Sequence, residues 1–337
     1  MSTKAVHPRD ALFEESERVA ELPVCDHYCG VEPRMRKSLA LQAELGPVFD
    51  VTLDCEDGAP VGAEAEHAHL VAELVMSGEN RFGRVGARVH PVDHPAFAQD
   101  AATLVGRAGE RLAYLMLPKP TGAADVARAA AEIDRQARLH GITRSIPLHT
   151  LVETHGALRE VQAIAAHPRI ESISFGLMDF VSAHRGAIPA TAMGSKGQFS
   201  HPLVVRAKLE IAAACHAFGK TPSHCVVTEF ADEDALTEAA TRASREFGYT
   251  RMWSIHPNQV RTIVEAFAPS AAEVDLAIQI IQAAQAAHWA PIRHRDTLHD
   301  RASYRYYWNL IARANRTSLV GGAQLPAAIR AAWFAPA

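Results

Sequence analysis

The sequence predicts a single (β/α)₈ barrel followed by a C-terminal helical extension. About eight short apolar runs typical of buried strands alternate with segments of helical periodicity, which is the pattern of a parallel barrel. The chain has 337 residues, whereas such barrels commonly need about 250, so there is room for added segments. An open doubly wound sheet is the alternative, but no glycine-rich phosphate fingerprint follows the first predicted strand.

The expected organisation is an N-terminal arm over residues 1–21, a barrel over 22–270 and a helical extension or lid over 271–337. The strands are short apolar runs, several of which deliver a charged residue at their end. They are predicted at residues 22–29, 48–53, 85–89, 114–117, 146–152, 170–175, 225–228 and 251–255.

Helices are predicted between the strands from apolar periodicity and from end signals. Pro33 suits the first turn of the first helix, and Gly141 suits the position just after the helix over residues 123–139. The other helices are predicted over residues 63–76, 157–166, 202–218 and 233–247, and beyond the barrel over 271–288 and 301–315. Residues 185–200, rich in Gly, Ala and Ser, are expected to form a lid, a phosphate-facing loop or a mobile loop without function.

The last predicted helix carries Tyr304, Tyr306, Tyr307 and Trp308, which indicates docking on another surface or packing on the barrel itself. The preceding residues, 289–300, are expected to be irregular.

Composition favours small-molecule chemistry in the cytoplasm. The net charge of −4 and the pI near 6.5 argue against a nucleic-acid footprint and against a basic membrane face. Residues 1–20 lack the apolar core of a secretory signal, and no apolar run is long enough to span a bilayer. The five cysteines are odd in number and contain no Cys-x-x-Cys pair, which argues against a disulfide framework and a zinc ribbon.

Two acids stand at equivalent ends of neighbouring predicted strands. Glu153 follows the strand over residues 146–152, and Asp179 lies just beyond the strand over 170–175. Two strand-end carboxylates suit Mg²⁺, or Mn²⁺, because such ions prefer oxygen ligands and usually take only one or two protein carboxylates. The alternative is that each acid caps a helix or forms a salt bridge.

A second group of charges is expected at the same edge. Asp54, Glu56 and Asp57 crowd the end of the second strand, where their repulsion requires cations or amides unless they form an acidic surface loop. Arg88 lies in an otherwise apolar strand and needs an anionic partner, which could be the Asp54 and Glu56 cluster, a structural ion pair or a substrate group. Lys119 follows the fourth strand.

Seven ordered motifs between residues 22 and 315 resemble the citrate lyase β-subunit-like group of the HpcH/HpaI aldolase family, which includes malyl-CoA and citramalyl-CoA lyases. Three departures stand out: His90 replaces the usual Asn after Arg-Val, residues 251–254 replace the usual Gly-Lys, and residues 289–297 lack the glycines of the closing lid. The motifs are Leu53-Asp54-Cys55-Glu56-Asp57-Gly58, Ala87-Arg88-Val89-His90, Leu117-Pro118-Lys119, Val152-Glu153-Thr154, Phe175-Gly176-Leu177-Met178-Asp179-Phe180, Ile255-His256-Pro257-Asn258-Gln259 and Ala266-Phe267-Ala268-Pro269-Ser270.

The resemblance implies a Mg²⁺-dependent homotrimer or homohexamer that cleaves or forms a carbon–carbon bond in a 3-hydroxyacyl-CoA, giving an acyl-CoA and a 2-oxo acid. It also implies that an Asp in the extension acts as general acid or base in a neighbouring subunit's site. The implied roles are metal binding by Glu153 and Asp179, substrate binding by Arg88, Asp54 and Lys119, support of metal-bound water by Asp54 and Glu56, and catalysis by Arg88, Glu56 and Asp300.

Other functions compatible with these residues are hydrolysis of an acyl-CoA thioester, aldol cleavage of a 2-oxo acid without CoA, and a non-catalytic subunit of a complex. The complete set of like charges argues against a non-catalytic subunit, because a site that has lost its activity has no physical reason to keep such charges together.

Overall fold

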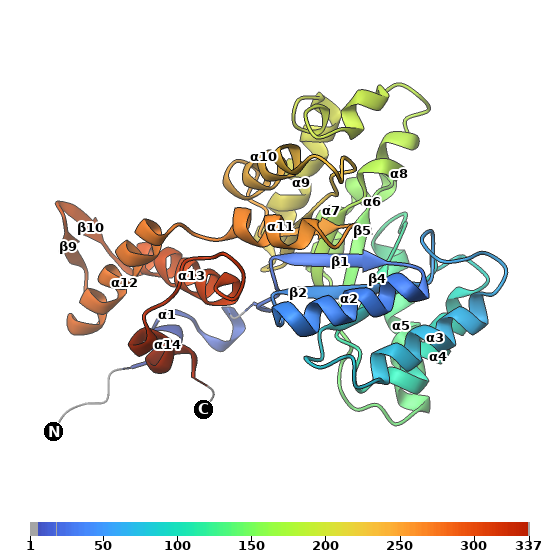
Figure 1. The fold of residues 1–337 in the computed structure, drawn as a ribbon, viewed down its shortest axis with the longest axis horizontal. Coiled ribbons are helices and arrows are strands. Elements are labelled where there is room, and N and C mark those ends of the chain that lie inside the picture. Colours follow the sequence, from blue (N-terminus) through green and yellow to red (C-terminus); the bar gives the residue numbers. More distant parts are fainter. Residues whose placement is uncertain (1–5, 18, 336–337) are drawn as a thin grey trace. The chain divides into compact units, whose positions relative to one another are not determined.

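The computed structural model describes residues 6–17 and 19–335 (Figure 1). Contacts divide the chain into two compact units. One comprises Ala20–Ala266, and the other joins the segment ending at Val19 to the segment that begins at Phe267. The N-terminal residues expected as a separate arm are therefore grouped with the C-terminal extension.

The first unit is a closed barrel of eight parallel strands in sequential order, which confirms the predicted fold class. Pairing of the first and last strands, with Cys25 opposite Met252, closes it. The strands are β1 Cys25–Cys29, β2 Phe49–Asp54, β3 Val85–Arg88, β4 Leu115–Leu117, β5 Leu148–Val152, β6 Ile170–Phe175, β7 Thr221–His224 and β8 Arg251–Ser254.

Helices follow the strands around the barrel. The helix predicted over residues 157–166 is divided into two helices at Glu160. The Glu160 side chain accepts a hydrogen bond from the backbone N–H of Ala123, the first residue of the neighbouring helix α5. Sequence periodicity did not identify α4, α8 or α11. The helices are α2 Glu32–Leu45, α3 Glu64–Met76, α4 Phe97–Ala108, α5 Ala123–Leu139, α6 His155–Arg159, α7 Val161–Ala166, α8 Leu177–Ser182, α9 Pro202–Ala217, α10 Glu233–Arg245 and α11 Gln259–Phe267.

The seventh strand was predicted in the wrong place. It was expected at residues 225–228, but β7 is Thr221–His224, and the apolar run lies beyond its C-terminal end. Polar residues and Pro222 hide the strand in the sequence, since proline donates no ladder hydrogen bond. Pairing decides the position instead, because Ser172 and Ile173 of β6 stand opposite Thr221 and Pro222.

The barrel interior contains charges where most such barrels contain branched aliphatic side chains. Arg251 is fully buried, with its guanidinium 2.6 Å from Asp50 Oδ2 and 3.1 Å from Asp26 Oδ2. Thr52 and Tyr114 both donate to Asp26 Oδ1, at 2.7 and 3.0 Å. The Arg251 guanidinium and the two carboxylates form the charged layer of the barrel. The side chains of Tyr114, Met116, Leu151 and Trp253 form an adjoining apolar cluster.

The second unit has its own core. Tyr304 and Trp308 are buried in that core with Leu12 and Trp333, whereas Tyr306 is 60% exposed. Tyr307 is partly buried and packs against the same core, so three of the four aromatic residues pack within this unit. Residues 289–300, expected to be irregular, contain a two-stranded antiparallel sheet. The elements are α1 Pro8–Leu12, α12 Ala271–Ala286, β9 Ile292–His294, β10 Thr297–His299, α13 Arg301–Thr317 and α14 Ala327–Phe334.

The described helices are all too short or too polar to cross a bilayer. All five cysteines are buried free thiols. In the predicted loop over residues 185–200, Gln198 and Phe199 are buried, so this end of the segment is anchored.

Replacing Arg251 with Met should lower the free energy of unfolding by about 3 kcal/mol, because it leaves the buried carboxylates of Asp26 and Asp50 without this cation. Urea denaturation followed by circular dichroism measures the change. The control is Arg261→Met, which removes the ion pair between Arg261 and Glu44. These two side chains are 54% and 65% exposed, so this variant should lower the free energy of unfolding far less. Equal losses in the two variants would contradict a stabilising role for the charged layer.

Candidate functional site

Charged side chains gather where the parallel strands of the barrel end, which is the face that carries the chemistry in such barrels. We refer to these residues as the rim cluster. Because every strand points the same way, residues far apart in sequence meet there. The rim cluster consists of Tyr28, Asp54, Glu56, Asp57, Arg88, Lys119, Glu153 and Asp179.

Asp54, the last residue of β2, is the main acceptor in the rim cluster. Arg88 Nε donates to its Oδ1 at 2.6 Å, and Arg88 Nη2 donates to its Oδ2 at 2.8 Å. The backbone N–H groups of Glu56 and Gly58 and the hydroxyl of Tyr28 also donate to this carboxylate. Burial acts to raise the pKa of Asp54, but the hydrogen bonds and charge of Arg88 hold it below its ordinary value.

Arg88 finds the anionic partners that its burial requires. In addition to its hydrogen bonds to Asp54, Arg88 places Nη2 3.2 Å from Glu56 Oε2 and donates from Nη2 to the Tyr28 hydroxyl at 2.5 Å. The guanidinium carbon also lies 4.7 Å from the centre of the Tyr28 ring. Burial opposes protonation, but Asp54 raises the pKa of Arg88 above its ordinary value, so the guanidinium stays charged. Of the three predicted partners, the acidic cluster is the one observed.

Lys119 connects the acidic cluster to the predicted metal carboxylates. Its Nζ donates to Glu56 Oε1 and to Asp57 Oδ2, both at 2.6 Å, and lies 4.0 Å from Asp179 Oδ1. Its backbone N–H donates to Glu153 Oε1 at 2.6 Å, from a left-handed conformation with φ of 49°. Such a conformation is uncommon outside glycine, so the hydrogen bonds around Lys119 must hold it.

Asp179 lies close enough to Glu153 for its charge to act on the Glu153 carboxylate. Glu153 is buried at the end of β5, whereas the Asp179 side chain, in the first turn of α8, is partly exposed. Burial, followed by the charge of Asp179, raises the pKa of Glu153 to about 8. Glu153 also passes so close to Gly176 that a Cβ there would lie 2.2 Å from its Oε2.

These two carboxylates fit a hard divalent cation. Within residues 6–17 and 19–335, no group of three or more His, Cys, Asp or Glu side chains is arranged to hold a metal. Mg²⁺ does not require three, since it usually keeps several waters and binds one or two carboxylates together with substrate. The mutual repulsion of Glu153 and Asp179 is the feature that a cation between them would relieve.

Asp300 lies in the other unit. It is exposed and caps the N-terminus of α13, where its Oδ1 accepts the backbone N–H groups of Ala302 and Ser303 at 3.0 and 3.4 Å. Its expected action in a neighbouring subunit's site therefore stays a prediction.

The side chains of His90 and Arg251, two of the departures, bind partners outside the rim cluster. His90 Nδ1 lies 2.7 Å from Asp100 Oδ2, which also accepts the backbone N–H of His90. Arg251 enters the charged layer, and two residues later Trp253 stacks on the Tyr28 ring with centroids 5.8 Å apart.

Sequence reasoning missed Tyr28. It lies in the first predicted strand, two residues after Asp26, so both side chains point to the same face of the strand. This alternation was the available signal.

The chain was compared with known proteins. The model of the HpcH/HpaI aldolase/citrate lyase family matches residues 37–257. The L-malyl-CoA/beta-methylmalyl-CoA lyase of Cereibacter sphaeroides is 29% identical over 249 residues, which cover 70% of this chain and 77% of that enzyme. The malyl-CoA/beta-methylmalyl-CoA/citramalyl-CoA lyase of Chloroflexus aurantiacus is 26% identical, over 79% of this chain and 82% of that enzyme.

Solved structures show the same relationship. The structure of a citrate lyase from Burkholderia xenovorans is 54% identical and matches with a TM-score of 0.82, covering 98% of this chain and all of that one. A structure of CitE from Mycobacterium tuberculosis with magnesium, acetoacetate and coenzyme A is 20% identical, with a TM-score of 0.66 over 87% of this chain and 98% of that one, and supports the fold. The chain therefore belongs to the HpcH/HpaI aldolase/citrate lyase family of carbon–carbon lyases.

Proposed function

We propose that this protein is a Mg²⁺-dependent lyase that cleaves a 3-hydroxyacyl-CoA into an acyl-CoA and a 2-oxo acid, or joins them in reverse. The observation that carries the proposal is the close pair of carboxylates, Glu153 and Asp179, beside the permanently charged guanidinium of Arg88. The names of the malyl-CoA lyases that this chain resembles support the substrate class.

Glu153 and Asp179 would hold the Mg²⁺, and Mn²⁺ would suit the same oxygen ligands. When bound, the cation would supply Lewis-acid polarisation of the oxygens of the substrate. Lys119 keeps the two carboxylates and the acidic loop in place, since its backbone N–H binds Glu153 while its ammonium binds Glu56 and Asp57. Its ammonium is also the cation available to a substrate carboxylate.

Arg88 would stabilise the negative charge that develops on the enolate oxygen as the carbon–carbon bond breaks. Its two hydrogen bonds to Asp54 fix the plane of the guanidinium, so little reorganisation is needed. Asp54 thus acts on the substrate through Arg88.

The Glu56 carboxylate lies between the arginine and Lys119, and at 3.2 Å it is the more distant acidic partner of Arg88. It is the group that can accept a hydrogen bond from ordered water in the site.

Cleavage also moves a proton from the substrate hydroxyl to the carbon that leaves as the enolate. A general base must take the first proton, and a general acid must supply the second. We assign the acid to Asp300, acting from the extension of a neighbouring copy in a homotrimer or homohexamer. In the direction of synthesis, the same carboxylate would be the base.

Thioester hydrolysis is the second candidate, and one observation favours it. A (3S)-malyl-CoA thioesterase of Cereibacter sphaeroides is 27% identical to this chain, over 74% of this chain and 80% of that enzyme. The same enolate-stabilising groups would serve a thioesterase if water entered the site. Aldol cleavage of a 2-oxo acid without CoA is the remaining alternative, and the products distinguish all three.

Replacing Gly176 with Ala should weaken Mg²⁺ binding by at least about tenfold, because the new methyl group would displace the Glu153 carboxylate. The backbone at Gly176, with φ of −86°, is accessible to alanine, so the fold should survive. Calorimetric titration with Mg²⁺ measures the effect, with Glu153→Gln as the benchmark. Gly78→Ala is the matched control, since nothing lies within 4 Å of its added Cβ. Unchanged affinity in both Gly176→Ala and Glu153→Gln would remove Glu153 from the metal site.

If Asp300 acts in a neighbouring copy, two inactive variants should complement each other. Mixing Asp300→Asn with Glu153→Gln protein under conditions that exchange subunits should restore up to about a quarter of the activity, because a random mixture reunites intact groups in about one site in four. Asp296→Asn, at an exposed position in the same segment, is the control. Mixed oligomers without recovered activity would argue against action between subunits.

The reaction itself can be tested without knowing the natural 2-oxo acid. With Mg²⁺ and acetyl-CoA or propionyl-CoA, the protein should exchange the α-protons of the acyl group with deuterated solvent, because the rim cluster is suited to forming an enolate. Adding glyoxylate or pyruvate should then give a hydroxyacyl-CoA, whereas a thioesterase would release free CoA. Mass spectrometry of both mixtures detects each product. Metal-loaded protein that gives neither exchange nor adduct with any short acyl-CoA would refute the CoA-lyase assignment.

A further inference from the structure

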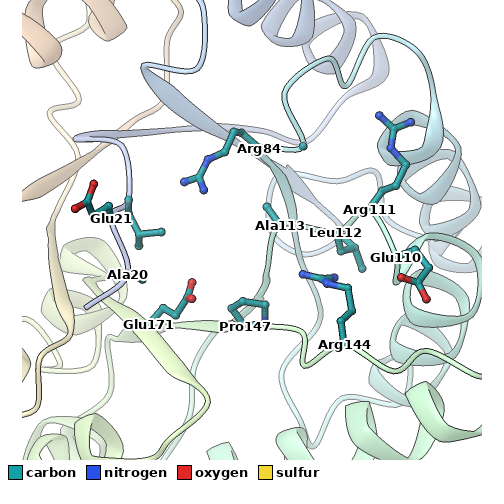
Figure 2. Close-up of a pocket in the computed structure, with 12 residues that line it drawn as sticks. Ala20, Glu21, Arg84, Glu110, Arg111, Leu112, Ala113, Arg144, Pro147 and Glu171 are labelled. Atoms are coloured by element: carbon teal, nitrogen blue, oxygen red, sulfur yellow. The ribbon is translucent and has the colours of Figure 1, made fainter. Parts of the chain in front are cut away.

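A cavity of about 410 Å³ opens at the end of the barrel opposite the rim cluster. Its wall is made by the segments that precede β1, β3, β4 and β5 and by the start of β6, so it lies at the N-terminal ends of the strands (Figure 2). All lining residues belong to the barrel unit. The volume falls in the range of roughly 300–1,000 Å³ that is usual for small-molecule sites.

Arg84 presents unused donors at this cavity. Its Nε forms an ion pair with Asp50 Oδ1 at 2.7 Å. About a quarter of the side chain, 26%, is exposed. A guanidinium carries five N–H groups, so the ion pair with Asp50 leaves Arg84 with donors for an anionic ligand.

Glu171, at the start of β6, presents the complementary group. Its carboxylate is 30% exposed, and its nearest basic neighbour is His149 Nε2 at 3.6 Å. Burial, followed by the charge of Arg251, lowers the pKa of His149 to about 3, so the imidazole is neutral and supplies no counter-charge. Figure 2 shows the Arg84 and Glu171 side chains directed into the space between them.

Two other arginines line the cavity, but only one is available to a ligand. Arg111 donates to the backbone carbonyl oxygens of Met76, Ser77 and Asn80, and its guanidinium points away from Arg84 and Glu171 in Figure 2. Arg144 makes one hydrogen bond, from Nη1 to the carbonyl oxygen of Gly109 at 2.6 Å. Arg144 lines the cavity and is therefore the second cationic group that a ligand would meet.

We propose that this cavity binds a small carboxylate that also carries a hydroxyl or ammonium group. The carboxylate would accept hydrogen bonds from Arg84 and Arg144, and the hydroxyl or ammonium would donate to Glu171. A simple anion would leave the Glu171 carboxylate unpaired, and a simple cation would face two guanidinium groups. The site is separate from the rim cluster, so the proposal does not depend on the reaction proposed above.

The proposal is tested by calorimetric titration of the full-length protein with Mg²⁺ present, using L-malate, L-aspartate and succinate as probes. Malate carries a hydroxyl, aspartate an ammonium group, and succinate neither. Malate, aspartate or both should bind, and each probe that binds should do so at least about tenfold more tightly than succinate, because one hydrogen bond to a charged group is worth about that factor.

Variants locate the binding site. Arg144→Gln and Glu171→Gln should each weaken binding of the better probe by about tenfold. Two controls, Arg261→Gln on the barrel surface and Glu153→Gln in the rim cluster, should leave it unchanged. Arg84 is left intact because its replacement would also disturb Asp50. Circular dichroism verifies that each variant is folded.

Three outcomes would overturn the proposal. Succinate binding as tight as that of both other probes would remove the role of Glu171. Binding that is lost in Glu153→Gln but kept in Arg144→Gln would place the probe at the rim cluster. Absence of heat with all three probes at millimolar concentration would show that the cavity does not take this class of ligand.

Discussion

The bidentate ion pair between Arg88 and Asp54 is the interaction on which the rim cluster depends. It joins the ends of β2 and β3, and Tyr28 from β1 completes it by bonding both partners. Burying an arginine in a barrel is costly unless its charge is paired and its donors are used. Here, each of the two nitrogens that face Asp54 has a carboxylate oxygen in line, so the guanidinium is held in one orientation. A fixed cation of this kind is what stabilisation of an enolate requires.

The carboxylates at the rim are not equivalent. Asp54 is stabilised as an anion by Arg88, Tyr28 and two backbone N–H groups, and its pKa stays low. Glu153 is equally buried but accepts a hydrogen bond from the Lys119 backbone and faces Asp179, so its pKa is raised. One acid is therefore committed to holding an arginine, while the other forms no ion pair with any residue that the structure describes. This difference in partners is the physical basis for assigning a cation to Glu153 and Asp179 and not to Asp54.

The side chains in the barrel interior connect the rim cluster at one end of the barrel with the charged cavity at the other end. Arg251 lies between Asp26 and Asp50. Arg84, which lines the cavity at one end of the barrel, forms an ion pair with the same Asp50. Trp253 packs on Tyr28 of the rim cluster, at the other end. A core of this kind must be satisfied as a whole, because the removal of one charge leaves the others unpaired in a low-dielectric interior.

The sequence by itself determined the barrel class, most of its strands and the ordered set of rim residues, because strand periodicity and charged strand ends are local signals. It also predicted that Arg88 has an anionic partner, with the Asp54 and Glu56 cluster as one of three possibilities, since an arginine within an apolar strand requires one. Only the tertiary structure decided that β7 is the polar segment Thr221–His224, because strand pairing outweighs hydrophobicity there. The positions of Tyr28, Arg251 and the Glu171 cavity likewise required the closed barrel. Arg251 of β8 meets Asp26 of β1 only when the last strand pairs with the first. Tyr28 meets Asp54 and Arg88, and Glu171 meets His149, across other strands of the same barrel.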